Sequence, residues 1–169
     1  MNTLPESTKQ RVLMVAATPF FSDRGSHIRI FEEIKWLTRE GAAVLLCSYH
    51  IGKDVPGIEV KRSFTIPWYK KIGPGASFHK VYIDIFLLWK TIHEASLFKP
   101  TIWHAHMYEG LLVAYLAKKI IRSKAPILFD FQGGLAEEID RYHLSKTHGF
   151  IRKLSIVFFT SIEKSLLKL

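Results

Sequence analysis

The sequence predicts an α/β fold: a Rossmann-like parallel sheet with helices on both faces. Five apolar runs of strand length begin at Arg11, Ala43, Ile58, Thr101 and Pro126. Helix-length segments separate most of these runs. Strands and helices that alternate in this way form βαβ units, whose strands are parallel. We therefore expect one sheet with the first strand at its centre.

The clearest βαβ unit lies at the start of the chain. Residues 11–16 (RVLMVA) are apolar and partly β-branched, which is typical of a buried strand. A loop over 18–26 leads into a helix expected from His27 to Glu40, where apolar residues recur at helical spacing. Gly41 stands where a glycine often ends a helix. A second buried strand follows over 43–48.

The later elements continue the alternation. Pro100 ends the helix that is expected before it, and the glycines at 133 and 134 end the strand that is expected before them. The expected elements are, in order, a strand over 58–62, an irregular loop over 65–77, a helix from about 77 to 97, a strand over 101–105, a helix over 109–123, a strand over 126–131, and helices from about 135 and 149.

Length and composition indicate one folded domain. The 169 residues suit a single domain with its own core, and 48% hydrophobic residues argue against disorder. Cys47 is the only cysteine, which fits a reducing compartment. The polar first residues do not resemble a secretory signal, and no uncharged apolar run reaches the roughly 18 residues of a membrane span. We therefore expect a cytoplasmic location.

The net charge of +9 favours anionic partners such as phosphates. The basic residues are dispersed and lack the interleaved aromatic residues of RNA-binding surfaces, so nucleic acid is not an expected partner. The basic amphipathic segment 152–168 leaves two interpretations open. It either contacts the inner face of the membrane peripherally or packs on the domain as an ordinary helix.

The loop after the first strand is the first candidate site. Ligands of such sheets bind outside the carboxyl ends of the strands. Gly25 would let a phosphate approach the backbone, and the following helix offers free N–H groups. The GxGxxG pattern of dinucleotide-binding proteins is missing, because the loop has one glycine. The alternative is a capped helix start with Ser26 as the N-cap.

His104 and His106 form the second candidate site. They alternate along a strand and therefore share one face of it. Two imidazoles at this spacing could bind a metal. The sequence ties no carboxylate or third histidine to them, so we expect no metal ion. His104 is interpreted as a core histidine, and His106, nearer the carboxyl end, as the site residue.

Asp130 is the third candidate. It leaves the carboxyl end of a buried strand, immediately before Gln132 and Gly133. A carboxylate is costly to bury there unless it has a partner. It could orient a hydroxyl group or act as a base. The alternative is a helix N-cap or a turn.

These segments together resemble a known family. The matching pieces are VLMVAATPF, RGSHIRIFEEIKWLTREGAAVLLCS, KPTIWHAH, PILFDFQGG and IEKSLL. Their order and spacing resemble the N-terminal domain of GT-B fold glycosyltransferases, in particular the retaining family 4, or "glycosyl transferases group 1". The resemblance extends over nearly the whole chain.

The resemblance implies that a hexose is transferred from a nucleoside diphosphate sugar to a hydroxyl, with retention and without a metal or other cofactor. It implies a saccharide or lipid-linked acceptor, with a role in cell-envelope glycan synthesis. The N-terminal domain of this family holds mainly the acceptor. The donor-binding C-terminal domain, with a basic pair and an E-x7-E motif, is not found in residues 1–169. We therefore expect this fragment to be inactive without that domain.

The residues and the resemblance together assign the site. Gly25 falls on the family's loop glycine near the donor phosphates. Asp130 falls on a position near the transferred sugar that is often histidine in the family. The expected catalytic residues are Asp130 and His106, and the expected substrate-binding residues are Gly25, Ser26, His27, Gln132 and Gly133.

Other functions remain open at this stage. One is a GT-B sugar-nucleotide epimerase, and another is a stand-alone Rossmann-like binding module. A nicotinamide oxidoreductase is disfavoured, because GxGxxG and a clear acid after the second strand are both missing.

Overall fold

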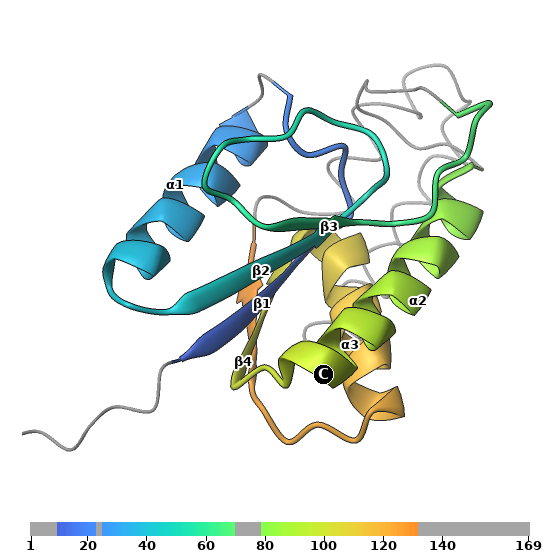
Figure 1. The fold of residues 1–169 in the computed structure, drawn as a ribbon. Helices are drawn as coiled ribbons and strands as arrows, with labels where there is room; N and C mark the ends of the chain where they lie inside the picture. The colour runs from blue at the N-terminus through green and yellow to red at the C-terminus, as the bar shows by residue number, and fades with distance from the viewer. Residues whose placement is uncertain (1–9, 23–24, 70–78, 132–169) are drawn as a thin grey trace, which may run out of the picture.

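The computed structural model describes residues 10–22, 25–69 and 79–131, which form a sheet between two helical layers (Figure 1). Within these residues the sheet has five parallel strands in the order β3-β2-β1-β4-β5. The predicted α/β class and the central place of the first strand are confirmed. The elements are β1 (Arg11–Ala16), α1 (Gly25–Arg39), β2 (Ala43–Ser48), β3 (Val60–Arg62), α2 (His79–Phe98), β4 (Ile102–His106), α3 (Met107–Ile120) and β5 (Ile127–Asp130).

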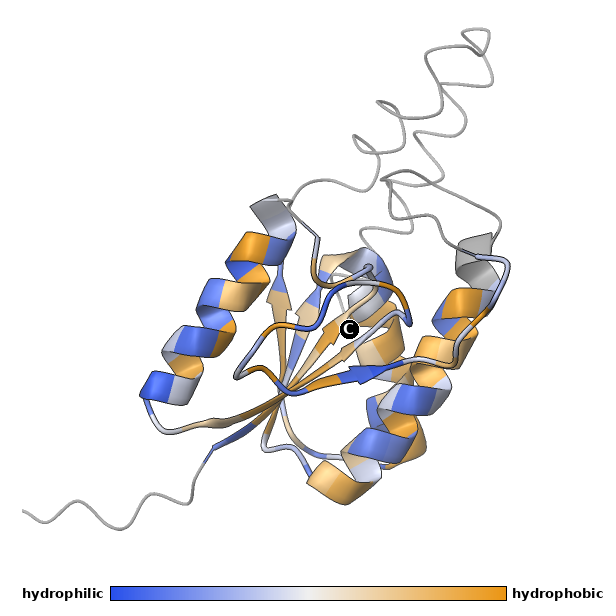
Figure 2. Ribbon diagram, turned by 45° about the horizontal axis from the view of Figure 1, so that its top comes forward, coloured by the Kyte–Doolittle hydropathy of each residue, from blue (hydrophilic) through white to orange (hydrophobic). Residues whose placement is uncertain are grey.

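One helix covers one face of the sheet and two helices cover the other. Under α1, the buried side chains of Val12 and Met14 on β1 pack with Ile30 and Ile34. Full burial of each such side chain stabilises the folded state by about 1.5–3 kcal/mol. Figure 2 shows the apolar strands lying between the amphipathic helices. Because side chains alternate along β1, this strand contributes residues to the apolar cores on both faces of the sheet.

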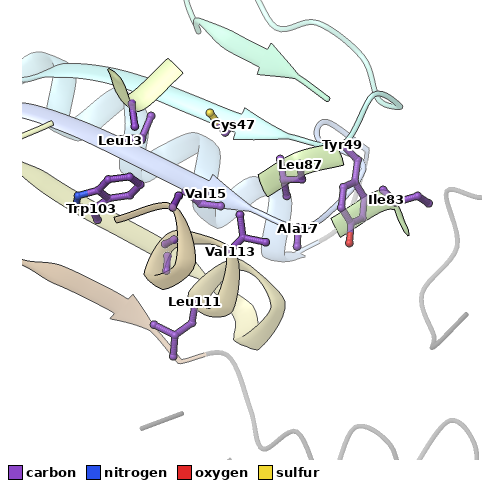
Figure 3. Packing of buried hydrophobic residues seen from close by; sticks show 14 of the residues in the cluster. Leu13, Val15, Ala17, Cys47, Tyr49, Ile83, Leu87, Trp103, Leu111 and Val113 are labelled. Atoms are coloured by element: carbon purple, nitrogen blue, oxygen red, sulfur yellow. The ribbon is translucent and has the colours of Figure 1, made fainter. Parts of the chain in front are cut away.

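The opposite face carries the larger core, which α2 and α3 cover. Trp103 on β4 is completely buried there, beside Leu13 and Val15 of β1 (Figure 3). Helix α3 approaches β1 closely at Gly110, where an added Cβ would lie 2.7 Å from the backbone oxygen of Val15. Only glycine allows this contact without a shift of the helix.

Several boundaries differ from the predictions by a few residues. Helix α1 begins at Gly25, so Ser26 lies in its first turn and is not the residue before the helix. Hydrophobic periodicity could not assign Gly25 and Ser26 to the helix, because neither residue adds to its apolar face. Gly41, with φ +85°, ends α1 as expected.

The fourth strand and the helix after it also differ from the predictions. Strand β4 runs on to His106, and α3 starts directly at Met107, whose φ is +62°. A residue other than glycine is rarely found in this conformation, and the abrupt turn ends the strand at His106. No described helix is long and apolar enough to cross a membrane. The helices expected from 135 and 149, including the basic segment 152–168, lie outside the described residues.

Candidate functional site

His106 and Asp130 lie side by side at the carboxyl edge of the sheet. They are register partners on β4 and β5, and register partners in a parallel sheet point to the same face. His106 Nδ1 lies 3.1 Å from Asp130 Oδ2, and both residues are buried. The two predicted catalytic residues are therefore hydrogen-bonded to each other.

Helix α1 adds two charged residues that the sequence analysis missed. Arg29 forms an ion pair with Asp130 Oδ1 through Nη2, and its Nε lies 3.1 Å from Glu33 Oε1. Glu33 Oε2 lies 3.8 Å from Nε2 of His104 and 3.8 Å from Nε2 of His106. Two carboxylates, one guanidinium and two imidazoles thus form one connected cluster between α1, β4 and β5.

Burial keeps both imidazoles of this cluster neutral. Desolvation, together with the neighbouring His106 ring, lowers the pKa of His104 to about 4. Desolvation also lowers the pKa of His106, against the opposing effect of its hydrogen bond to Asp130. At neutral pH the two rings therefore offer lone pairs and carry no charge.

The reason for expecting no metal ion at the histidine pair is wrong. That expectation assumed that no carboxylate lies near His104 and His106. Glu33 lies against both rings, and one donor atom from each of the three residues falls within 4.8 Å of the others. His104 is buried, as expected of a core histidine, but it belongs to this cluster.

Arg29 and Glu33 could be identified as site residues only by combining their spacing on the helix with the order of the strands in the sheet. Each directly precedes a residue of the buried stripe of α1, namely Ile30 and Ile34. They therefore share one flank of the helix. Which strand lies beneath that flank depends on strand order, and the spacing of residues in the sequence does not give it. A salt-bridge spacing of four residues is otherwise common on exposed helix faces.

His27 is placed differently from the prediction. It is completely buried, with Nε2 2.7 Å from Thr18 Oγ1 and Nδ1 accepting from the backbone N–H of Ser22 at 2.9 Å. Both ring nitrogens are thus engaged within the β1–α1 loop. This geometry makes His27 an anchor of the loop, and the predicted direct contact with substrate is not supported by it.

The base of the same loop is fixed by β3 and by the segment after β2. The Arg62 guanidinium donates to the backbone oxygens of Phe20, Ile51 and Lys53. At Gly52, with φ +129°, an added Cβ would lie 1.9 Å from the backbone oxygen of Phe20. The Arg62 hydrogen bonds and the close contact with Gly52 therefore fix the backbone of the β1–α1 loop at Phe20.

Gly25 and Ser26 are the first two residues of α1 and follow the β1–α1 loop. Apart from its chain neighbours and the backbone of its own helix, no described atom lies within 4 Å of the place where a Cβ on Gly25 would be. Among the described residues, none covers this backbone. Arg29 reaches Asp130 one turn further along the helix, so the start of α1 belongs to the same edge of the sheet. Gln132 and Gly133 lie outside the described residues.

A groove of about 530 Å³ opens beside the cluster, between α1 and the β4–β5 half of the sheet. Its polar lining comes from Arg29, Glu32, Glu33, Arg39 and His104, and Trp36 and Leu128 contribute apolar surface. Both apolar side chains are more than half exposed. The cluster is therefore accessible from the groove through Glu33 and His104.

The fold and this edge cluster define a Rossmann-like α/β domain with a polar site at the carboxyl ends of β4 and β5. Its structure is similar to that of sucrose-phosphate synthase from Thermosynechococcus elongatus, with a TM-score of 0.64 over 95% of this chain. The two sequences are 11% identical, so the similarity concerns the fold. The chain covers 41% of the length of that enzyme. No family model and no curated protein matches the sequence.

Proposed function

We propose that this chain is the acceptor-side domain of a retaining family 4 glycosyltransferase. It would work with a second, donor-binding domain to transfer a hexose from a nucleoside diphosphate sugar to a hydroxyl of a saccharide or lipid-linked acceptor. Cell-envelope glycan synthesis is the setting that the sequence resemblance favours. Peripheral contact with the cytoplasmic face of the membrane through 152–168 belongs to the same proposal.

The observation that carries this proposal is the pairing of His106 with Asp130 at the edge where α1 begins. Ligands of doubly wound sheets bind at this edge. Both residues of the pair are buried, and the groove beside them is lined by Arg29, Glu33 and His104 of the same cluster. The sequence resemblance and the fold of a sucrose-phosphate synthase support a sugar nucleotide as the ligand.

Each group of the site has a distinct task in the proposed transfer. The amino end of α1 presents N–H groups and the positive end of the helix dipole to the departing diphosphate. The open backbone at Gly25 lets that diphosphate come close. Asp130 accepts a hydrogen bond from a sugar hydroxyl and stabilises the positive charge that develops on the ring. His106 and Arg29 hold the carboxylate in place.

The proposal is tested by comparing the 169-residue chain alone with a longer protein that also carries the donor-binding domain. The assay supplies a panel of nucleoside diphosphate hexoses and hydroxyl acceptors, and it follows nucleoside diphosphate release and product configuration. We expect turnover with retention in the longer protein and none in the chain alone. Epimerised sugar nucleotide without transfer would favour the epimerase, and turnover by the chain alone would contradict the need for a second domain.

Gly25→Val should raise the donor KM of the longer protein at least tenfold, because the side chain occupies the space where the diphosphate approaches. The space is empty in the described structure and the φ of Gly25 is not in the left-handed region, so the fold should tolerate the change. Steady-state kinetics with varied donor would measure the effect. Gly25→Ala places a smaller side chain in the same space and should raise the donor KM less than Gly25→Val does.

The melting temperature separates the two explanations of a Gly25→Val defect. An unchanged melting temperature with a raised KM supports a ligand at the helix start. An unchanged KM would mean that the backbone at Gly25 does not contact the donor, and the loop would then serve only to begin α1.

A further inference from the structure

We infer that Glu33, His104 and His106 bind one divalent transition-metal ion of the Zn²⁺ type, at a site that shares His106 with the proposed transfer site. Two imidazole nitrogens and one carboxylate oxygen converge there from α1 and β4. The Glu33 oxygen Oε2 lies 3.8 Å from each Nε2, and all three donor atoms lie within 4.8 Å of one another. Donors around tetrahedral zinc, at bond lengths of 2.0–2.2 Å, are about 3.4 Å apart. The two Glu33–histidine distances would have to shorten by about 0.4 Å, and the distance between the two histidine donors by up to about 1.4 Å.

Two donor atoms of this site are buried without a hydrogen bond. Glu33 Oε2 and His106 Nε2 have no partner among the described residues, and His106 is completely buried. Leaving a buried polar atom unpaired costs about 1–3 kcal/mol, and more for a charged group. Both atoms carry lone pairs and they face each other. A cation between them would satisfy both at once, which a direct contact between two acceptors cannot do.

The surrounding residues orient these donors. Asp130 Oδ2 lies 3.1 Å from His106 Nδ1, so the ring donates its Nδ1–H there and presents the Nε2 lone pair to Glu33. A carboxylate behind a histidine is the usual support of a metal-binding imidazole. Arg29 engages Glu33 Oε1 and leaves Oε2 directed at the histidines. Arg29 is also the positive charge nearest the cluster, and the carboxylates of Glu33 and Asp130 offset it.

The groove provides an entry path and room for a fourth ligand. Glu33 and His104 line its wall, whereas His106 lies behind them. The Glu33 side chain is 27% exposed although its Oε2 atom is buried, so we expect an ion to enter when this side chain moves at the groove wall. Three protein ligands and one open position match the common arrangement of accessible zinc sites. Neutral imidazoles and a carboxylate suit Zn²⁺ or Co²⁺ better than Mg²⁺, which prefers oxygen ligands only.

The test is metal binding by the 169-residue chain, prepared without a histidine tag and freed of metal by chelation. Zn²⁺ content after dialysis is measured by mass spectrometry, Zn²⁺ affinity by competition with a chromophoric chelator, and coordination by the visible absorption of bound Co²⁺. We expect one Zn²⁺ per chain, a four-coordinate Co²⁺ spectrum, and a higher melting temperature with Zn²⁺, since a ligand that binds the folded state stabilises it.

Matched variants locate the ion within the chain, which has eight histidines. Glu33→Gln should weaken Zn²⁺ at least tenfold, because it removes the one anionic ligand. Asp130→Asn should weaken it about 10- to 100-fold through the loss of support behind His106. Glu59→Gln is the control carboxylate, which pairs with Lys61 outside the groove, and His93→Asn is the control for an exposed imidazole. Both controls should bind Zn²⁺ as the unchanged chain does.

Absence of stoichiometric Zn²⁺ in the unchanged chain would overturn the inference, whatever the variants do. So would binding that survives Glu33→Gln or that disappears with His93→Asn. Circular dichroism of each metal-free variant shows whether it is folded. If Glu33→Gln does not fold, the Co²⁺ spectrum of the unchanged chain decides, since six-coordinate weak binding in place of a four-coordinate site contradicts the assignment.

Discussion

Asp130→Asn is expected to lower the kcat of the longer, two-domain protein by about 100-fold while it changes the donor KM little. Loss of a positioned charged group that acts in the transition state typically costs factors of this order. The amide keeps the size of the carboxylate but removes the charge that pairs with Arg29. A fall in kcat with an unchanged KM means that the lost contact forms mainly in the transition state.

The assay for this variant should contain a chelator, so that the metal content of the two proteins does not differ. Glu59→Gln, which neutralises an exposed carboxylate that pairs with Lys61, is the control and should keep full activity. An Asp130→Asn enzyme with normal kcat would show that the carboxylate only ties β5 to α1. A lowered kcat together with a much lower melting temperature would point to the same structural role.

Trp103→Ala is expected to destabilise the chain by about 3–5 kcal/mol, the usual cost of truncating a fully buried tryptophan. Trp103 has no exposed surface, and its Nε1 donates to Ser123 Oγ at 3.3 Å. Its loss leaves a cavity at the centre of the larger core. Urea titration followed by circular dichroism gives the free energy of unfolding. Trp89→Ala on α2, where the side chain is 66% exposed, should change that free energy by no more than about 0.5 kcal/mol.

Labelling of Cys47 gives a second, independent measure of the difference in stability between Trp103→Ala and Trp89→Ala. It is the only cysteine, it is buried, and burial raises the pKa of its thiol to about 12. A thiol reagent should therefore label it only when the structure opens. Labelling should be much faster in Trp103→Ala than in Trp89→Ala. Equal labelling rates would mean that the region around Trp103 does not contribute to global stability.

The sheet could be predicted from the sequence because its strands are continuous apolar runs. The predicted bounds of β1 and β2 agree with the structure, since the polar Gln10 precedes the first run and Gly41 lies just before the second. The predicted strand over 101–105 began and ended one residue early, and His106 is the buried last residue of β4. Burial of a polar side chain depends on tertiary partners that an apolar pattern cannot show.

The candidate site was predictable only in part, for the same reason. His106 and Asp130 follow from the rule that ligands collect at the carboxyl edge of a parallel sheet. Arg29 and Glu33 reach that edge from the side of α1, and their spacing is also that of an ordinary surface salt bridge. His27 looked like a ligand in a polar loop, but Thr18 and Ser22 satisfy its ring. Such pairings become visible only when the loop is folded.

The central place of β1 in the strand order also bears on how the chain acquires its structure. One edge of β1 pairs with β2, where Arg11 lies opposite Ala43, and the other pairs with β4, where Val12 lies opposite Ile102. The first pairing closes a short loop and the second a much longer one, so the β1–α1–β2 unit can form early in folding. Until residues near 106 have left the ribosome, the apolar second edge of β1 has no partner strand. During synthesis that exposed edge is where mispairing with another chain would begin.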